Sequence, residues 1–143
     1  MEYVKKLKAA CTEKEWEEYR ERLIRENRTT SLSYQLLEMD GLYGRMLTQI
    51  EEDGSIWTLD QYETQLKGKF PEQVRDMYIK YVKDSVDKAS DRSTYSSLAR
   101  YLKKIRSYPD GEEIAEQIAA EWRRKYNRRR ALIEELRKAG FDI

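Results

Sequence analysis

The residues best suited to chemistry form a run of cations near the end of the 143-residue sequence. Six of the eight positions from 123 to 130 are basic, and a tyrosine lies among them: Arg123, Arg124, Lys125, Tyr126, Arg128, Arg129 and Arg130. Guanidinium and ammonium groups bind phosphate oxygens, so this segment is a candidate contact for the backbone of nucleic acid. No base-reading motif accompanies it, and cations in the last turn of a helix also complement the helix dipole. Both interpretations stay open from the sequence.

A second candidate site is a surface of tyrosine and arginine in the C-terminal half. Exposed Tyr and Arg side chains on one helical surface are typical of protein interfaces. We expect Tyr101 and Tyr108 to lie off the main apolar stripes and therefore to be exposed. The alternative is that most of these rings belong to the core, with their hydroxyls at its margin. The predicted partner-binding residues are Tyr101, Tyr108, Arg123, Tyr126 and Arg129.

Residue types that commonly carry catalysis or bind metals are scarce. The sequence has no histidine, and so it lacks the usual proton shuttle at neutral pH and the commonest metal ligand. Cys11 is the single cysteine, so it can form no internal disulfide and has no histidine to activate it. Neighbouring acids such as Glu112 and Glu113 point in different directions on a helix and do not converge on one substrate atom. We therefore predict no enzyme, no metal site and no cofactor.

One acidic segment has the spacing of a calcium loop. Glu51, Asp53 and Asp60 are placed like ligands of a helix-loop-helix calcium site, with Gly54 at the sharp turn. Gln49 occupies the position of the first carboxylate, and no partner loop is present. These departures favour a simpler interpretation, in which Gly54 ends one helix and a new helix follows.

Charge and hydropathy set further limits. The 28 basic and 27 acidic residues give a net charge of +1, so any binding to nucleic acid or to an anionic membrane requires a local patch. No apolar run approaches the roughly 20 residues of a membrane helix, and no signal peptide is recognisable. We expect a cytoplasmic protein without membrane contact.

Apolar residues recur at spacings of three and four along the chain, and no segment shows the two-residue alternation of a strand. The clearest stripes are Tyr95 to Ile105 and Ile114 to Tyr126, separated by the turn residues Tyr108-Pro109-Asp110-Gly111. Two stripes joined by a short turn predict an antiparallel helical hairpin. We predict one all-α domain over residues 1–143, with seven or eight helices as stacked hairpins in a short solenoid or an irregular bundle.

Helix boundaries follow from residues that cap or break helices. Thr12 with Glu15 matches a capping box, and Thr58 begins a second candidate. Pro71 suits the first position of a helix, and Asp91 suits a cap. A turn is expected at residues 28–31 and at Gly54 and Gly140.

The C-terminal third resembles a known family. The residues that carry the likeness are Asp91 to Tyr95, Leu98 to Ile105, Pro109, Gly111, Trp122, Tyr126 and Arg129. Over residues 90–139 they are similar to the helical C-terminal region of bacterial SWIM zinc-finger proteins. The resemblance implies a helical appendage, while the zinc-binding Cys and His set of that family has no counterpart in this sequence.

Taken together, the sequence predicts a non-enzymatic helical module for protein–protein interaction. The alternative is a nucleic-acid-binding accessory domain that uses the arginine-rich segment 123–130.

Overall fold

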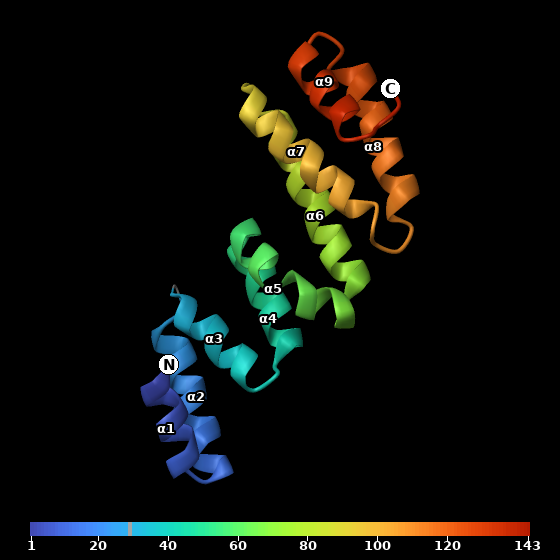
Figure 1. Ribbon diagram of the computed structural model, residues 1–143. Coiled ribbons are helices and arrows are strands. Elements are labelled where there is room, and N and C mark those ends of the chain that lie inside the picture. Colours follow the sequence, from blue (N-terminus) through green and yellow to red (C-terminus); the bar gives the residue numbers. More distant parts are fainter. Residues whose placement is uncertain (29) are drawn as a thin grey trace. The chain divides into compact units, whose positions relative to one another are not determined.

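The computed structural model describes residues 1–28 and 30–143, and within these residues it contains nine α-helices and no strand (Figure 1). The all-α prediction is confirmed. The predicted count of seven or eight helices was slightly too low. Thr29, part of the turn predicted at residues 28–31, lies outside the described residues. The helices are α1 (Glu2–Ala10), α2 (Glu13–Glu26), α3 (Ser31–Met39), α4 (Tyr43–Asp53), α5 (Ile56–Lys69), α6 (Pro71–Val86), α7 (Arg92–Ile105), α8 (Gly111–Lys125) and α9 (Arg130–Lys138).

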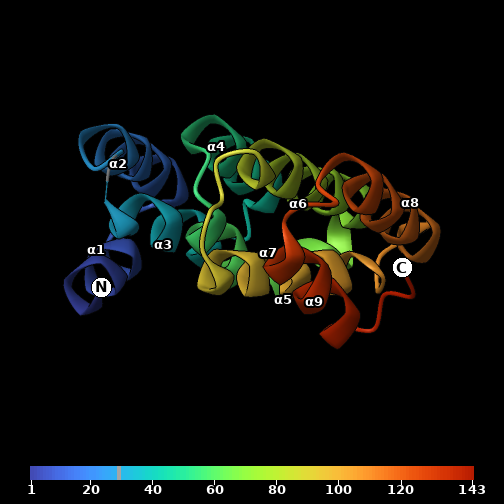
Figure 2. The same cartoon turned by 90° about the horizontal axis from the view of Figure 1, so that it is seen from above.

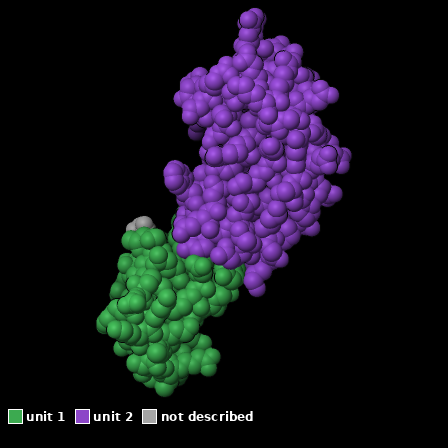
Figure 3. All heavy atoms as spheres, viewed as in Figure 1, with its two compact units in different colours: residues 1–54 green, residues 55–143 purple. Residues whose placement is uncertain are grey.

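The chain divides into two compact units, Met1–Gly54 and Ser55–Ile143 (Figure 3). Their charges differ in sign. The first unit has 9 basic and 12 acidic residues, whereas the second has 19 basic and 15 acidic residues. The nearly neutral chain therefore contains an acidic unit with net charge −3 and a basic unit with net charge +4. The single domain predicted for residues 1–143 stays a prediction.

In the first unit, the carboxylate of Asp40 at the end of α3 is bound by side chains of two other helices. Lys8 Nζ donates to Oδ1 at 2.5 Å, while Trp16 Nε1 and Arg20 Nη1 donate to Oδ2 at 2.6 and 3.0 Å. Burial opposes ionisation of this group, but the hydrogen bonds from Lys8, Trp16 and Arg20 outweigh it and lower the pKa of Asp40. The carboxylate thus ties α1 and α2 to the end of α3.

The second unit is arranged around α7. This helix packs against α6, α8 and α9, and α5 packs against α6. Figures 1 and 2 show α6 and α7 side by side, running in opposite directions. The buried side of α7 carries Tyr95, Leu98, Ala99, Tyr101, Leu102 and Ile105. The stacking of all helices as hairpins, in a solenoid or a bundle, stays a prediction.

Most predicted helix ends are confirmed. Thr12 and Glu15 form a reciprocal capping box, and Gly54 ends α4 in the left-handed conformation at φ 65°. Pro71 is the first residue of α6, and Asp91 accepts a hydrogen bond from the Thr94 amide at 2.7 Å. The cap predicted at Thr58 was wrong. α5 begins at Ile56, because the Ser55 hydroxyl accepts from the Thr58 amide at 3.3 Å and caps the helix one turn earlier.

The turn between α7 and α8 brings Gly111 close to the backbone of Ile105. Asp110 has φ 55°, and a Cβ atom on Gly111 would lie 1.8 Å from the carbonyl oxygen of Ile105. Only glycine fits such an approach without displacing the backbone. Pro109 and Gly111 were predicted as turn residues, and this close approach is the physical reason for glycine at position 111.

In the part of the chain that the structure describes, none of the helices combines the length and the apolar character needed to span a lipid bilayer.

Candidate functional site

Tyr101 and Tyr108 lie inside the second unit, where they bind carboxylates of α5. Tyr101 is 6% exposed and donates to Asp60 Oδ2 at 2.5 Å, and Tyr108 is 4% exposed and donates to Glu63 Oε2 at 2.5 Å. Tyr78 of α6 donates to the other oxygen of Asp60 at 2.7 Å. The expected exposure of Tyr101 and Tyr108 was therefore wrong. Tyr101 belongs to the apolar stripe of α7, and its hydroxyl reaches a charged group at the margin of the core.

A lysine and stacked rings complete this cluster. Lys104 Nζ pairs with Glu63 at 3.0 Å and with Asp60 at 3.4 Å, and it lies 5.1 Å from the ring centroid of Tyr78. The rings of Tyr78 and Tyr101 stack with centroids 5.7 Å apart. We call Asp60, Glu63, Tyr78, Tyr101, Lys104 and Tyr108 the Asp60 cluster.

The electrostatics of the Asp60 cluster favour a structural role. Burial and the hydrogen bond to Asp60 raise the pKa of Tyr101 to about 12. Burial and the hydrogen bond to Glu63 raise the pKa of Tyr108 as well. A phenol with a raised pKa keeps its proton at neutral pH and is a poor general base. These tyrosines therefore act as fixed hydrogen-bond donors that join α5, α6 and α7.

Tyr126 and Arg129 form a second group at the end of α6. Tyr126 is 8% exposed and donates to the Asp87 carboxylate. The guanidinium of Arg129 stands 4.4 Å from the ring centroid of Tyr126 and donates to the Val86 carbonyl at 2.7 Å. Arg129 also donates hydrogen bonds to the carbonyl oxygens of Asp87 and Ala89, at 3.3 and 3.4 Å. Arg129 thus supplies donors to carbonyls at the end of a helix, where a cation is favoured. The burial of Tyr126 agrees with its place on the predicted apolar stripe from Ile114 to Tyr126 and leaves its ring little accessible to a partner.

The other cations of segment 123–130 remain accessible. Arg123, Arg124, Arg128 and Arg130 are exposed, and none of them forms an ion pair with any residue that the structure describes. Lys125 does have an acidic partner, since its Nζ lies 3.9 Å from Asp87 Oδ1. We call the four unpaired residues the arginine corner. The structure thus leaves Arg123 of the predicted partner-binding set at the surface and ties Arg129 to α6.

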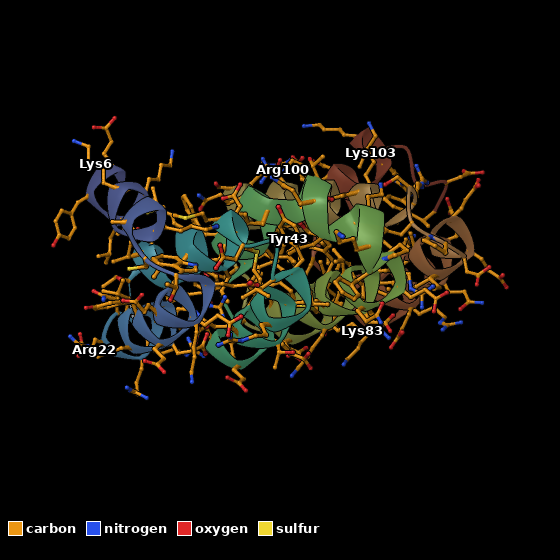
Figure 4. All side chains as sticks on the ribbon, turned by 90° about the horizontal axis from the view of Figure 1, so that it is seen from below. Lys6, Arg22, Tyr43, Lys83, Arg100 and Lys103 are labelled. Atoms are coloured by element: carbon orange, nitrogen blue, oxygen red, sulfur yellow. The ribbon has the colours of Figure 1, made fainter. Side chains whose placement is uncertain are left out.

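Other basic residues of the second unit are spread over its surface. Lys83, Arg100 and Lys103, labelled in Figure 4, are exposed side chains of α6 and α7. Residues 100–106 also contain four cations, but Lys104 and Arg106 pair with Glu63 and Glu116, whereas all four cations of the arginine corner lack an acidic partner in the described residues.

A further surface, on α5, was missed by the sequence reasoning. Trp57 is 85% exposed, the largest value among the exposed large hydrophobic residues of the described chain. The exposed positions that follow on the same side of α5 carry no charge. We call this surface the outer face of α5, and it comprises Trp57, Gln61, Thr64, Gln65 and Gly68. A tryptophan outside the Leu59, Tyr62 and Leu66 stripe was the signal available in the sequence.

The remaining sequence candidates have ordinary surroundings. Cys11 is half-buried. The calcium spacing does not produce a loop there, because Gln49 to Asp53 are helical. Gln49 donates to Ser33 Oγ at 2.9 Å, and both oxygens of Asp53 accept from Arg28 at 2.9 Å. Among residues 1–28 and 30–143, no group of three or more metal-binding side chains is gathered.

No protein-family model, no curated protein and no solved structure matches this chain.

Proposed function

We propose that the chain is a non-catalytic helical module that binds the phosphate backbone of nucleic acid through Arg123, Arg124, Arg128 and Arg130. The observation that carries this proposal is the exposure of all four guanidinium groups without an acidic partner in the described residues. Arg75, Arg92, Lys104 and Arg106 of the same unit each pair with an acid, whereas the four guanidinium groups of the arginine corner do not. Burial of the tyrosines leaves the accessible part of the predicted contact set basic rather than aromatic.

The charge of the whole unit supports the same partner. Its net charge of +4 gives a mild attraction to polyanions, which the acidic first unit lacks. Each phosphate contact on duplex DNA contributes about −0.9 to the slope of log affinity against log salt concentration. Four arginine contacts therefore correspond to a slope of about −3.6.

The test compares the full chain with the variant Arg124→Gln/Arg128→Gln. Binding to labelled duplex DNA and RNA is followed by fluorescence anisotropy over a series of salt concentrations. We expect the slope to become shallower by about 1.8, because two phosphate contacts are lost. The matched control is Lys80→Gln/Lys103→Gln, which removes the same charge from exposed positions of α6 and α7. Equal slopes of log affinity against log salt concentration for the two double variants would contradict the proposal.

A protein–protein interaction module is the second candidate, and the outer face of α5 favours it. An exposed tryptophan in an uncharged surface is a common anchor of protein interfaces. The test uses the chain as bait with and without nuclease. This candidate expects a partner whose retention survives nuclease and is lost for Trp57→Ala. A partner lost with nuclease and unaffected by Trp57→Ala would favour nucleic acid instead.

We also propose that residues 90–139 correspond to the helical C-terminal region of bacterial SWIM zinc-finger proteins. The support is the likeness in residue type and spacing from Asp91 to Arg129, and three of these residues have defined contacts in the structure. Gly111 makes the close turn, and Tyr126 and Arg129 contact the end of α6. An experimental structure of such a region in which the equivalent residues lie on the surface would count against the relationship.

A further inference from the structure

The outer face of α5 has the geometry of one side of a two-helix contact. At about 100° per residue, its members Trp57, Gln61, Thr64 and Gly68 fall within about 60° of one another around the helix axis. They lie opposite Leu59, Tyr62 and Leu66, the buried residues of the same helix. Their successive spacings of four, three and four residues are those of a seam along which a second helix packs.

The composition of this face sets it apart from the remaining surface. Charged residues make up 38% of the chain, yet the five exposed residues of the outer face of α5 include none. Depletion of charge around an aromatic anchor is typical of the centre of a protein interface. A face kept only for solubility would carry charges, as the exposed side of α8 does with Glu112, Glu113 and Glu121.

Gly68 gives an independent indication of a close neighbour. Its backbone is not in the left-handed region, and a Cβ atom at this position would meet no atom within 4 Å. Neither backbone conformation nor packing within the chain therefore requires glycine there. Glycine is unfavourable within a helix, and its use on a helix surface permits another chain to approach closely.

The order of side-chain sizes along the seam selects the occupant. The seam begins with the largest side chain, Trp57, and ends with none, at Gly68. Two antiparallel copies place the Trp57 of each over the Gly68 of the other, and Gln61 opposite Thr64. Such a contact is isologous, because the same surface serves both copies and every residue finds its complement.

We propose that a second copy of this chain binds the outer face of α5, in an antiparallel α5–α5 dimer with Trp57 of each copy over Gly68 of the other. A parallel pair would set tryptophan against tryptophan at one end and leave a void between glycines at the other. The Gln61 amide and the Thr64 hydroxyl can hydrogen-bond across the centre of the antiparallel pair.

The size of the seam limits its strength. From Trp57 to Gly68 it spans about 17 Å at the rise of an α-helix. A contact of this length buries less surface area than the roughly 1,600 Å² of a standard interface. We therefore expect an equilibrium between monomer and dimer that depends on protein concentration.

The experiment measures the mass of the full chain by sedimentation over a range of concentrations, with fold monitored by circular dichroism. We expect a dimer at high concentration for the natural sequence and a loss of at least tenfold in association for Trp57→Ala. Gly68→Leu should weaken association similarly, because it fills the site of the opposing ring, while its Cβ atom would meet no atom within 4 Å in its own chain. Gln117→Leu is the control, since it adds an exposed leucine on α8.

The exchanged variant Trp57→Ala/Gly68→Trp tests the antiparallel arrangement itself. It restores the pairing of large with small only if residue 57 of one copy faces residue 68 of the other, and association should recover. A chain that stays monomeric at every concentration, even if Trp57 binds some other protein, would overturn the proposal. So would a dimer that Trp57→Ala and Gly68→Leu leave unchanged.

Discussion

Tyr101 donates its phenolic hydrogen to Asp60 at 2.5 Å, although 41 residues separate the two in sequence. Tyr78 donates to the other oxygen of the same carboxylate at 2.7 Å. One acidic side chain of α5 thereby joins α6 and α7, and the rings of the two donors stack on each other. Hydrogen bonds to a charged acceptor are stronger than those between neutral groups, so this carboxylate is a principal tie within the second unit.

Tyr101→Phe should lower the free energy of unfolding by about 1.5 kcal/mol, because it removes one hydrogen bond to a charged group and keeps the ring. Urea unfolding followed by circular dichroism measures the change. Tyr81→Phe is the matched control. Tyr81 packs against the Tyr101 ring with centroids 5.3 Å apart, and its hydroxyl has no hydrogen-bond partner among the described residues. Equal losses for the two variants would contradict a role for the Asp60 contact.

The contribution of Tyr101 should disappear in alkali. Its pKa of about 12 lies above the ordinary value of 10.0, so the folded state holds the phenolic proton more tightly than the unfolded state. Its stabilising effect is therefore complete below pH 10 and is lost as the pH rises toward 12. We expect the difference in urea midpoint between the natural sequence and Tyr101→Phe to narrow over this range. A constant difference would argue against the raised pKa.

Arg129→Lys should destabilise the second unit by about 1–2 kcal/mol even though the charge is kept. A lysine cannot reproduce the planar fork that reaches the Val86 and Asp87 carbonyls while stacking on Tyr126. Arg128→Lys at the neighbouring exposed position should change stability by less than about 0.5 kcal/mol. Thermal unfolding of both variants measures the contrast, and similar melting temperatures would refute the assignment.

Two glycines should respond to alanine in opposite directions. Gly111→Ala should cost about 3 kcal/mol, because its Cβ would lie 1.8 Å from the Ile105 carbonyl oxygen and the α7–α8 turn must shift. Gly68→Ala should stabilise by about 0.5 kcal/mol, since it meets open space and alanine favours the helix. Chemical unfolding of both variants at a low protein concentration provides the comparison. Stabilisation by Gly111→Ala would be incompatible with this turn.

Local features of the fold could be predicted from the sequence because they depend on neighbouring residues. The Thr12 capping box, the left-handed Gly54 and the first-turn Pro71 each involve contacts within a few positions. The helical spacing of apolar residues likewise identified α7 and α8. The cap of α5 was misplaced because Ser55 and Thr58 are both suitable residues, and only the packing of the helix decides between them.

The environment of the candidate site residues could not be predicted, because it depends on partners distant in sequence. Tyr126 has its acceptor at Asp87, 39 residues away, and Arg129 has its carbonyl acceptor at Val86, 43 residues away. Tyrosine composition alone does not distinguish an exposed ring from a buried ring with a bonded hydroxyl. Trp57 was overlooked because an exposed tryptophan lies outside every apolar stripe, so periodicity gives it no role.

The position of α7 has a consequence for hydrogen exchange. Because α7 packs against α6, α8 and α9, its amides can open only when several of its neighbours separate. They should therefore be the slowest amides to take up deuterium, with protection that approaches the full unfolding free energy of the second unit. Helix α1, in which Val4 is the one buried residue, should take up deuterium by fraying well before that unit unfolds.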